Sequence, residues 1–252
     1  MNTVEQLDVS GSHREVGLNI GLHFAGAIHR LFDNYDFLQE QLLPFLNTSA
    51  GQSFFQSCLK LHQIHFPQYN EFGILHSVNH VAPRPVKAGL GRHFIARSLL
   101  EARSLVEAVR CASIPGRAAG FNYNIGSLPE RRIVSMEVSP ERHYVHEVQG
   151  YYLHTNHYLE LNDQKQKITL SSRKRLERSM ILCRATFPIN SGHVLALLSD
   201  QTDRDYPIYR DATLPDDNAT LCSALFDLDN RQLRIYWDNP VREPEKYIQL
   251  VQ

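Results

Sequence analysis

Apolar residues in the first part of the chain recur at the spacing of an α-helix, with one such stretch running over residues 14–46. The residues that would share one face of this helix are Ile20, Phe24, Ile28, Leu31 and Phe32. A second stretch, residues 50–66, ends before Pro67, because proline lacks the N–H that a helix interior needs. The pattern predicts an N-terminal helical segment over residues 1–73.

A third helix is predicted to begin near Gly91 and to end before Pro115 and Gly116. The apolar positions that repeat along it are Ile95, Leu99, Ala102, Val106 and Val109. Further on, residues 171–185 form a basic stretch that also predicts a helix.

The period changes to two after residue 130, where Val134, Met136 and Val138 alternate with polar residues. This alternation predicts a half-buried strand, followed by a turn in the sequence SPER and by a second strand over residues 149–159. Residues 220–240 predict a hairpin that turns near Asp229 and Asn230. In its second strand, Leu233, Ile235 and Trp237 are expected to share one face.

Helices that flank an antiparallel sheet define an α+β fold. We expect one domain over residues 1–252, in which the core of the fold occupies residues 74–252 after the helical segment.

Composition excludes several classes of function. The formal net charge is −1, so no global basic field exists to hold nucleic acid or an acidic membrane. No stretch reads as a signal peptide or as a membrane span. The cysteines, Cys58, Cys111, Cys183 and Cys222, are scattered and form no CxxC pair. This usage fits a reducing compartment, and we expect a cytoplasmic protein with neither nucleic-acid nor membrane partners.

The sequence HTNH concentrates polar groups at His154, Asn156 and His157. The two histidines would point to opposite faces of a strand, and no HExxH motif accompanies them, so we expect neither a metal nor a cofactor. Asn156 has two interpretations. Its side chain could donate a hydrogen bond to a developing oxyanion, or it could hydrogen-bond the backbone of a turn. The basic run over residues 173–178 is typical of a solvated helix face, with anion binding as the alternative.

Several segments, taken in order, resemble one family. They are an opening glycine-rich helix over residues 9–28, the middle helix, the HTNH block, Ser172, Arg175 and Arg178 in the basic helix, and the closing segment from Tyr206 to Pro240. Together they are similar to the acyl-coenzyme A:isopenicillin N acyltransferase family (peptidase C45) of cysteine N-terminal-nucleophile hydrolases.

The resemblance implies a four-layer αββα sandwich that breaks or transfers linear amides. In that family a cysteine freed by self-cleavage attacks the acyl carbon, and its α-amino group serves as the base. Three positions are carried over as catalytic residues. Asn156 matches the family's asparagine near the oxyanion, Asn79 the asparagine that ends an earlier strand, and Arg210 the arginine that faces the nucleophile.

The chain departs from the family where the nucleophile should stand. The family's cysteine is followed by two small hydroxyl residues, and none of the four cysteines here is. We therefore expect an incomplete sandwich and an inactive relative of the amide hydrolases and acyltransferases, whose ligand would be a small-molecule amide or acyl donor. The alternative is a noncatalytic protein that binds a ligand or partner. We also expect the nucleophile strand and its neighbours to be missing as a block just before residues 75–80. Their absence would leave an open sheet edge near Asn79, so a homodimer is also expected.

Overall fold

The protein is described here from a computed structural model. The structure describes residues 68–84, 87–162, 165–186, 190–216, 218–242 and 246–249. The helices predicted before Pro67 lie outside these residues, and the domain boundary predicted at residue 74 remains a prediction. No helix in the described ranges is long and apolar enough to span a membrane.

The larger sheet has five antiparallel strands in the order β1-β2-β3-β4-β5. The strands are β1 (Gln68–Tyr69), β2 (Ile74–His80), β3 (Phe121–Ser127), β4 (Arg132–Val138) and β5 (His143–Glu147). The predicted strand at Val134–Val138 and its turn are confirmed by β4 and by the turn that leads to β5.

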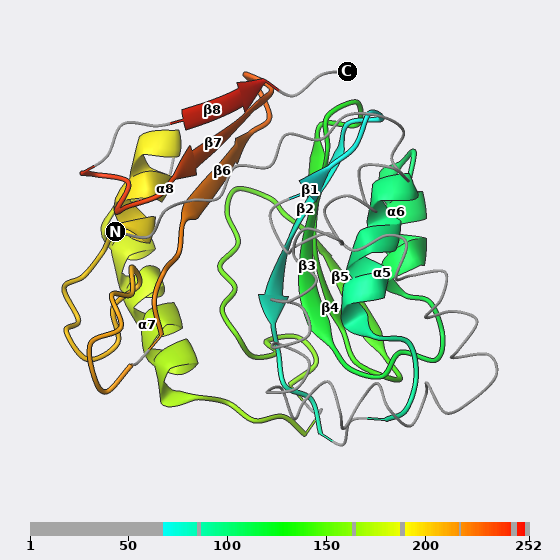
Figure 1. Cartoon of the computed structure of the whole chain (residues 1–252), viewed down its shortest axis with the longest axis horizontal. Coiled ribbons are helices and arrows are strands. Elements are labelled where there is room, and N and C mark those ends of the chain that lie inside the picture. The colour runs from blue at the N-terminus through cyan, green and yellow to red at the C-terminus, as the bar shows by residue number, and fades with distance from the viewer. Residues whose placement is uncertain are drawn as a thin grey trace, which may run out of the picture.

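One face of this sheet is apolar and carries the main core. Side chains from β3 and β4, including Tyr123, Ile125 and Met136, are fully buried there. Three short helical elements supply the rest of this core: α5 (Arg92–Ser98), the 3-10 helix η2 (Leu99–Glu101) and α6 (Leu105–Ala112). In Figure 1, α5 and α6 cover this face of the sheet.

The predicted third helix is therefore interrupted, and Ser104 gives the physical reason. Ser104 has an extended backbone, with φ −148 and ψ 163, and its side chain accepts a hydrogen bond from the Glu107 N–H. An N-cap serine of this kind begins a new helix instead of continuing the previous one. The predicted spacing holds up to the break, because Ile95, Leu99 and Ala102 enter the same core, but it fails after it. Val106 is 72% exposed, and Leu105 and Ala108 are buried in its place.

The second sheet has three antiparallel strands, β6 (Ser223–Asp227), β7 (Gln232–Tyr236) and β8 (Lys246–Gln249). The hairpin β6–β7 confirms the one predicted from the sequence, although Trp237 lies just beyond its end and is 40% exposed. The basic helix is confirmed as α7 (Leu170–Ala185), and α8 (Ser191–Leu198) follows it.

The two sheets meet through apolar side chains. Leu75 of β2 and Leu233 of β7 are buried together, with Phe226 and Ile235 packed around them. In Figure 1, α7 and α8 lie beside β6–β8 on the side away from the larger sheet.

Residues 148–162 are a loop, and the strand predicted at 149–159 is wrong. Toward the end of this loop, side chains instead of a neighbouring strand accept several of its N–H groups. The Glu137 carboxylate binds the N–H groups of Leu159, Glu160 and Leu161, and Ser172 Oγ binds the N–H of Asn156. The tyrosines and leucines that flank HTNH therefore gave a false strand signal.

The outer edge of β2 is only partly paired. β1 pairs with Leu75 and His76, and among the described residues no strand pairs with the outer edge of residues 77–80. An unpaired edge can template association between chains, but the expected homodimer stays a prediction.

Candidate functional site

The face of the larger sheet opposite the helical core turns polar along β2. Leu75 is apolar and contacts the second sheet, whereas Ser77 and Asn79, on the same face, begin two polar rows. The strand register continues these rows. Asn79 lies beside Asn122 and then Glu137, and Ser77 lies beside Asn124 and then Ser135.

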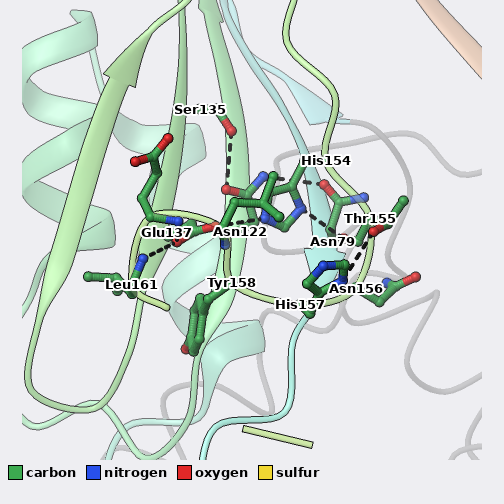
Figure 2. Close-up of polar contacts among 12 residues, drawn as sticks. Asn79, Asn122, Ser135, Glu137, His154, Thr155, Asn156, His157, Tyr158 and Leu161 are labelled. Carbon is green, nitrogen blue, oxygen red and sulfur yellow. Dashed lines mark hydrogen bonds and ion pairs between the residues drawn. The ribbon is translucent and has the colours of Figure 1, made fainter. Parts of the chain in front are cut away.

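The amides and hydroxyls of these rows bind one another (Figure 2). Asn79 Oδ1 accepts hydrogen bonds from Asn122 Nδ2 at 3.3 Å and from Asn124 Nδ2 at 3.1 Å. Ser135 Oγ lies 3.1 Å from the side-chain oxygens of both Asn122 and Asn124. Because its oxygen is held on one side, the Asn79 amide presents its nitrogen away from the cluster. No described residue accepts a hydrogen bond from that nitrogen.

Glu137 ends one of these rows and anchors the following loop. One carboxylate oxygen contacts His154 Nε2 at 3.0 Å and the Leu159 N–H at 2.6 Å. The other accepts the N–H groups of Glu160 at 3.0 Å and Leu161 at 2.8 Å. Burial raises the pKa of Glu137, but the hydrogen bonds from His154 and from the loop outweigh it, so the net pKa is lowered. The carboxylate is therefore an ionised anchor for residues 154–161.

His154 faces acceptors with both ring nitrogens. Its Nδ1 lies 2.8 Å from the Thr155 carbonyl oxygen, and its Nε2 faces the Glu137 carboxylate. The side chains of His154 and Glu137 are each 2% exposed, so this contact is buried.

Helix α7 holds the other side of the loop through Ser172, which is fully buried. Its hydroxyl oxygen accepts the Asn156 N–H at 2.8 Å and lies 2.8 Å from His157 Nδ1. The Thr155 hydroxyl donates to the Ser172 carbonyl at 3.0 Å. Burial lowers the pKa of His157, with the neighbouring His154 as the next cause. Through the contact between its Nδ1 and Ser172 Oγ, His157 helps to fix the loop.

The Asn156 side chain bridges strand β2 and helix α7. Its Nδ2 donates to the His80 carbonyl at 3.0 Å, and its Oδ1 accepts from Arg175 Nη2 at 2.7 Å. Two different partners thus define which end of the amide is nitrogen. The second N–H of Nδ2 has no acceptor among the residues that the structure describes.

A further chain of contacts leads from Arg175 to Arg210. Arg175 Nε donates to Ser171 Oγ at 3.2 Å, and Ser171 Oγ donates to Asp216 Oδ2 at 2.6 Å. Arg210 binds both oxygens of Asp216, at 3.0 and 2.7 Å. This carboxylate is buried, yet hydrogen bonds from Arg210, Ser171 and Asn218 bring its pKa down to about 2.

The structure thus places the three residues chosen from the sequence as follows. Asn79 and Asn156 both adjoin the end of β2, Asn79 as a member of the strand and Asn156 through the His80 carbonyl. Arg210 is connected to Asn156 through Asp216, Ser171 and Arg175. Their roles in chemistry remain predictions.

The cysteines of the described ranges lie outside these contacts. Cys111 is on α6, on the helical side of the larger sheet, and Cys183 is buried on α7. Cys222 directly precedes β6. Burial raises the pKa of Cys183 and of Cys222, which disfavours the thiolate. Cys58 lies outside the described residues.

Sequence reasoning missed most of the supporting residues. Asn122 and Asn124 alternate with Phe121, Tyr123 and Ile125, a period-two pattern that could have predicted a strand with one polar face. Asp216 had no such signal, because its contact with Arg210 depends on the path of an irregular loop. Within the described ranges, no cluster of histidine, cysteine or acidic residues could hold a metal ion.

The described fold is of the α+β class and carries a polar, amide-lined site beside the end of β2. The sequence profile of the acyl-coenzyme A:6-aminopenicillanic acid acyl-transferase family matches residues 30–242, so the chain belongs to this family. The resemblance predicted from the sequence is thereby confirmed.

One curated relative is the beta-alanyl-dopamine/carcinine hydrolase of Drosophila melanogaster. It is 26% identical over 196 residues, which cover 70% of this chain and 50% of that protein. The chain therefore spans about half the length of the curated relative it matches.

Proposed function

We propose that this chain forms an amide-binding site of the hydrolase and acyltransferase type, and that it binds a linear amide or acyl donor without transferring the acyl group. The observation that carries the proposal is the arrangement of Asn79 and Asn156. Each amide oxygen is held by fixed donors, so each amide nitrogen keeps an N–H for a ligand carbonyl oxygen.

From the positions of its cysteines, from the pKa of their thiols and from the residues that follow them, we infer that the chain transfers no acyl group. Covalent acyl transfer by cysteine needs a thiolate close to the oxyanion donors. No cysteine of the described ranges is among the hydrogen-bond partners of the Asn79 and Asn156 side chains, and burial raises the pKa of Cys183 and of Cys222. None of the four cysteines is followed by two hydroxyl residues. The chain is thus proposed to be a pseudoenzyme.

The order of the layers supports an αββα sandwich. Leu75 and Leu233 join the two sheets, and helices lie outside each of them. The site would then lie on the face of the larger sheet that points toward the second sheet, where Ser77 and Asn79 follow Leu75.

Intact-mass spectrometry after incubation with a panel of amides and thioesters tests the proposal, with thermal-shift binding assays in parallel. We expect one species near 28.9 kDa, apart from removal of Met1, and no acyl adduct. At least one amide should bind, and Asn79→Ala should weaken that binding. Asn230→Ala, in the β6–β7 turn, is the matched control. A pair of cleaved subunits or a stable acyl adduct would show an active enzyme.

A further inference from the structure

A positive charge without a carboxylate partner lies beside Asn156. Arg175 and Arg210 are linked through Ser171 and Asp216, and Arg210 is the residue that pairs with Asp216, at 2.7 Å. Among the described residues, no carboxylate lies within ion-pair distance of Arg175, whose two recorded partners are Asn156 and Ser171, both neutral.

The Arg175 guanidinium is only partly used. Its Nε and Nη2 each make one hydrogen bond, and Nη1 meets no acceptor in the described part of the chain. Nη1 is not fully enclosed by the protein, so it remains reachable from solvent. A guanidinium edge that is half-buried and still open is suited to bind a planar oxyanion.

Asp216 cannot neutralise both arginines. Its Oδ2 accepts from Arg210 Nε at 3.0 Å and from Ser171 Oγ at 2.6 Å, and its Oδ1 accepts from Arg210 Nη2 and from Asn218. The two arginines and one carboxylate therefore leave one positive charge. Burial first, and then the nearby Arg210, lowers the pKa of Arg175 to about 10, so the group stays charged at pH 7.

We propose that Arg175, with Arg210 behind it, forms a subsite for a ligand carboxylate next to Asn156. The amide part of this ligand rests on the proposed function, whereas the carboxylate contact does not. A monocarboxylate supplies the single negative charge that the cluster lacks. A phosphate group would bring about 1.5 to 2 negative charges into the same half-buried space.

The test compares small ligands by isothermal titration calorimetry on the full chain at pH 7. N-acetylglycine and N-acetylglycinamide share an amide and differ in the carboxylate, acetate supplies the carboxylate alone, and inorganic phosphate supplies the competing anion. We expect N-acetylglycine to bind at least about tenfold more tightly than N-acetylglycinamide, the size of a charge-assisted hydrogen-bonded contact.

Variants assign the effect to Arg175. Arg175→Gln should abolish the preference for the acid, and Arg175→Lys should keep part of it because the charge remains. Arg184→Gln, an exposed arginine on the same helix, should change nothing. Should Arg175→Gln fail to fold, the ligand comparison on the unsubstituted chain and on Arg175→Lys decides.

The outcomes separate the two proposals. Equal affinities for N-acetylglycine and N-acetylglycinamide would overturn the carboxylate subsite and leave the proposed amide binding intact. Arg175-dependent binding of acetate and of N-acetylglycine, without any binding of N-acetylglycinamide, supports the subsite and removes the proposed amide function. Tighter binding of phosphate than of every carboxylate, or an acid preference that survives in Arg175→Gln, also overturns the subsite.

Discussion

Glu137 and His154 form a buried pair, with Glu137 Oε1 and His154 Nε2 3.0 Å apart and each side chain 2% exposed. The pair joins strand β4 to the loop that carries Asn156, and the same carboxylate binds three backbone N–H groups of that loop. The position of the candidate site therefore depends on a residue of the sheet that is not one of the three carried over as catalytic.

Replacing Glu137 by glutamine should destabilise the fold by about 2–4 kcal/mol. Glutamine keeps the shape, but its NH₂ group would face the N–H donors that the carboxylate now accepts. Chemical denaturation measures the loss. Glu141→Gln is the control, since Glu141 is exposed on the β4–β5 turn and pairs with Lys87, and it should cost under about 0.5 kcal/mol. Equal effects of the two substitutions would contradict the anchoring role.

Asp216 should contribute stability that is lost in acid. Its folded pKa of about 2 lies below the usual value of 3.8, so its contribution is fully present above about pH 4 and disappears as the pH falls toward 2. Asp216→Asn should lower the free energy of unfolding at pH 7, because Arg210 loses its partner. Between pH 4 and 2, the variant should lose less stability than the unsubstituted chain. If the free energies of unfolding of the variant and of the unsubstituted chain fell in parallel between pH 4 and 2, the Arg210–Asp216 pair would contribute no stability.

Ser172→Ala should cost about 1.5–3 kcal/mol, because it removes the acceptor of the buried Asn156 N–H and the partner of His157. Ser113→Ala, at the end of α6, removes only a local hydrogen bond and should cost under about 0.5 kcal/mol. Thermal melts of both variants measure the difference. A neutral Ser172→Ala would show that α7 does not hold the loop.

Cys183 and Cys222 should react slowly with iodoacetamide at pH 7, and faster as the pH rises. Burial raises the pKa of each thiol, which lowers the thiolate fraction. Mass spectrometry after timed labelling gives the rate at each cysteine, and free cysteine is the reference. A cysteine of this chain that labels faster than the reference would identify an activated nucleophile and argue for catalysis.

The chain should self-associate through the outer edge of β2, where no described strand pairs with residues 77–79. An open strand edge favours strand addition, and a net charge of −1 offers little repulsion. Light scattering over a range of concentrations measures the mass. A monodisperse monomer at high concentration would refute the dimer.

Periodicity by itself determined much of the core. The alternation at Val134, Met136 and Val138 and the helical spacing of Ile95, Leu99 and Ala102 each mark one buried face, because a strand and a helix repeat with fixed periods. The ordered motifs also determined the family, which the profile over residues 30–242 confirms.

Only the tertiary structure decided how the polar groups combine. Nothing local shows that Glu137 would hold the N–H groups of Leu159 to Leu161, so the loop after β5 read as a strand. Nor could spacing connect Arg175 to Asn156, 19 residues away, or Arg210 to Asp216. Such contacts depend on which elements pack together, and a hydrogen bond between distant residues leaves no period in the sequence.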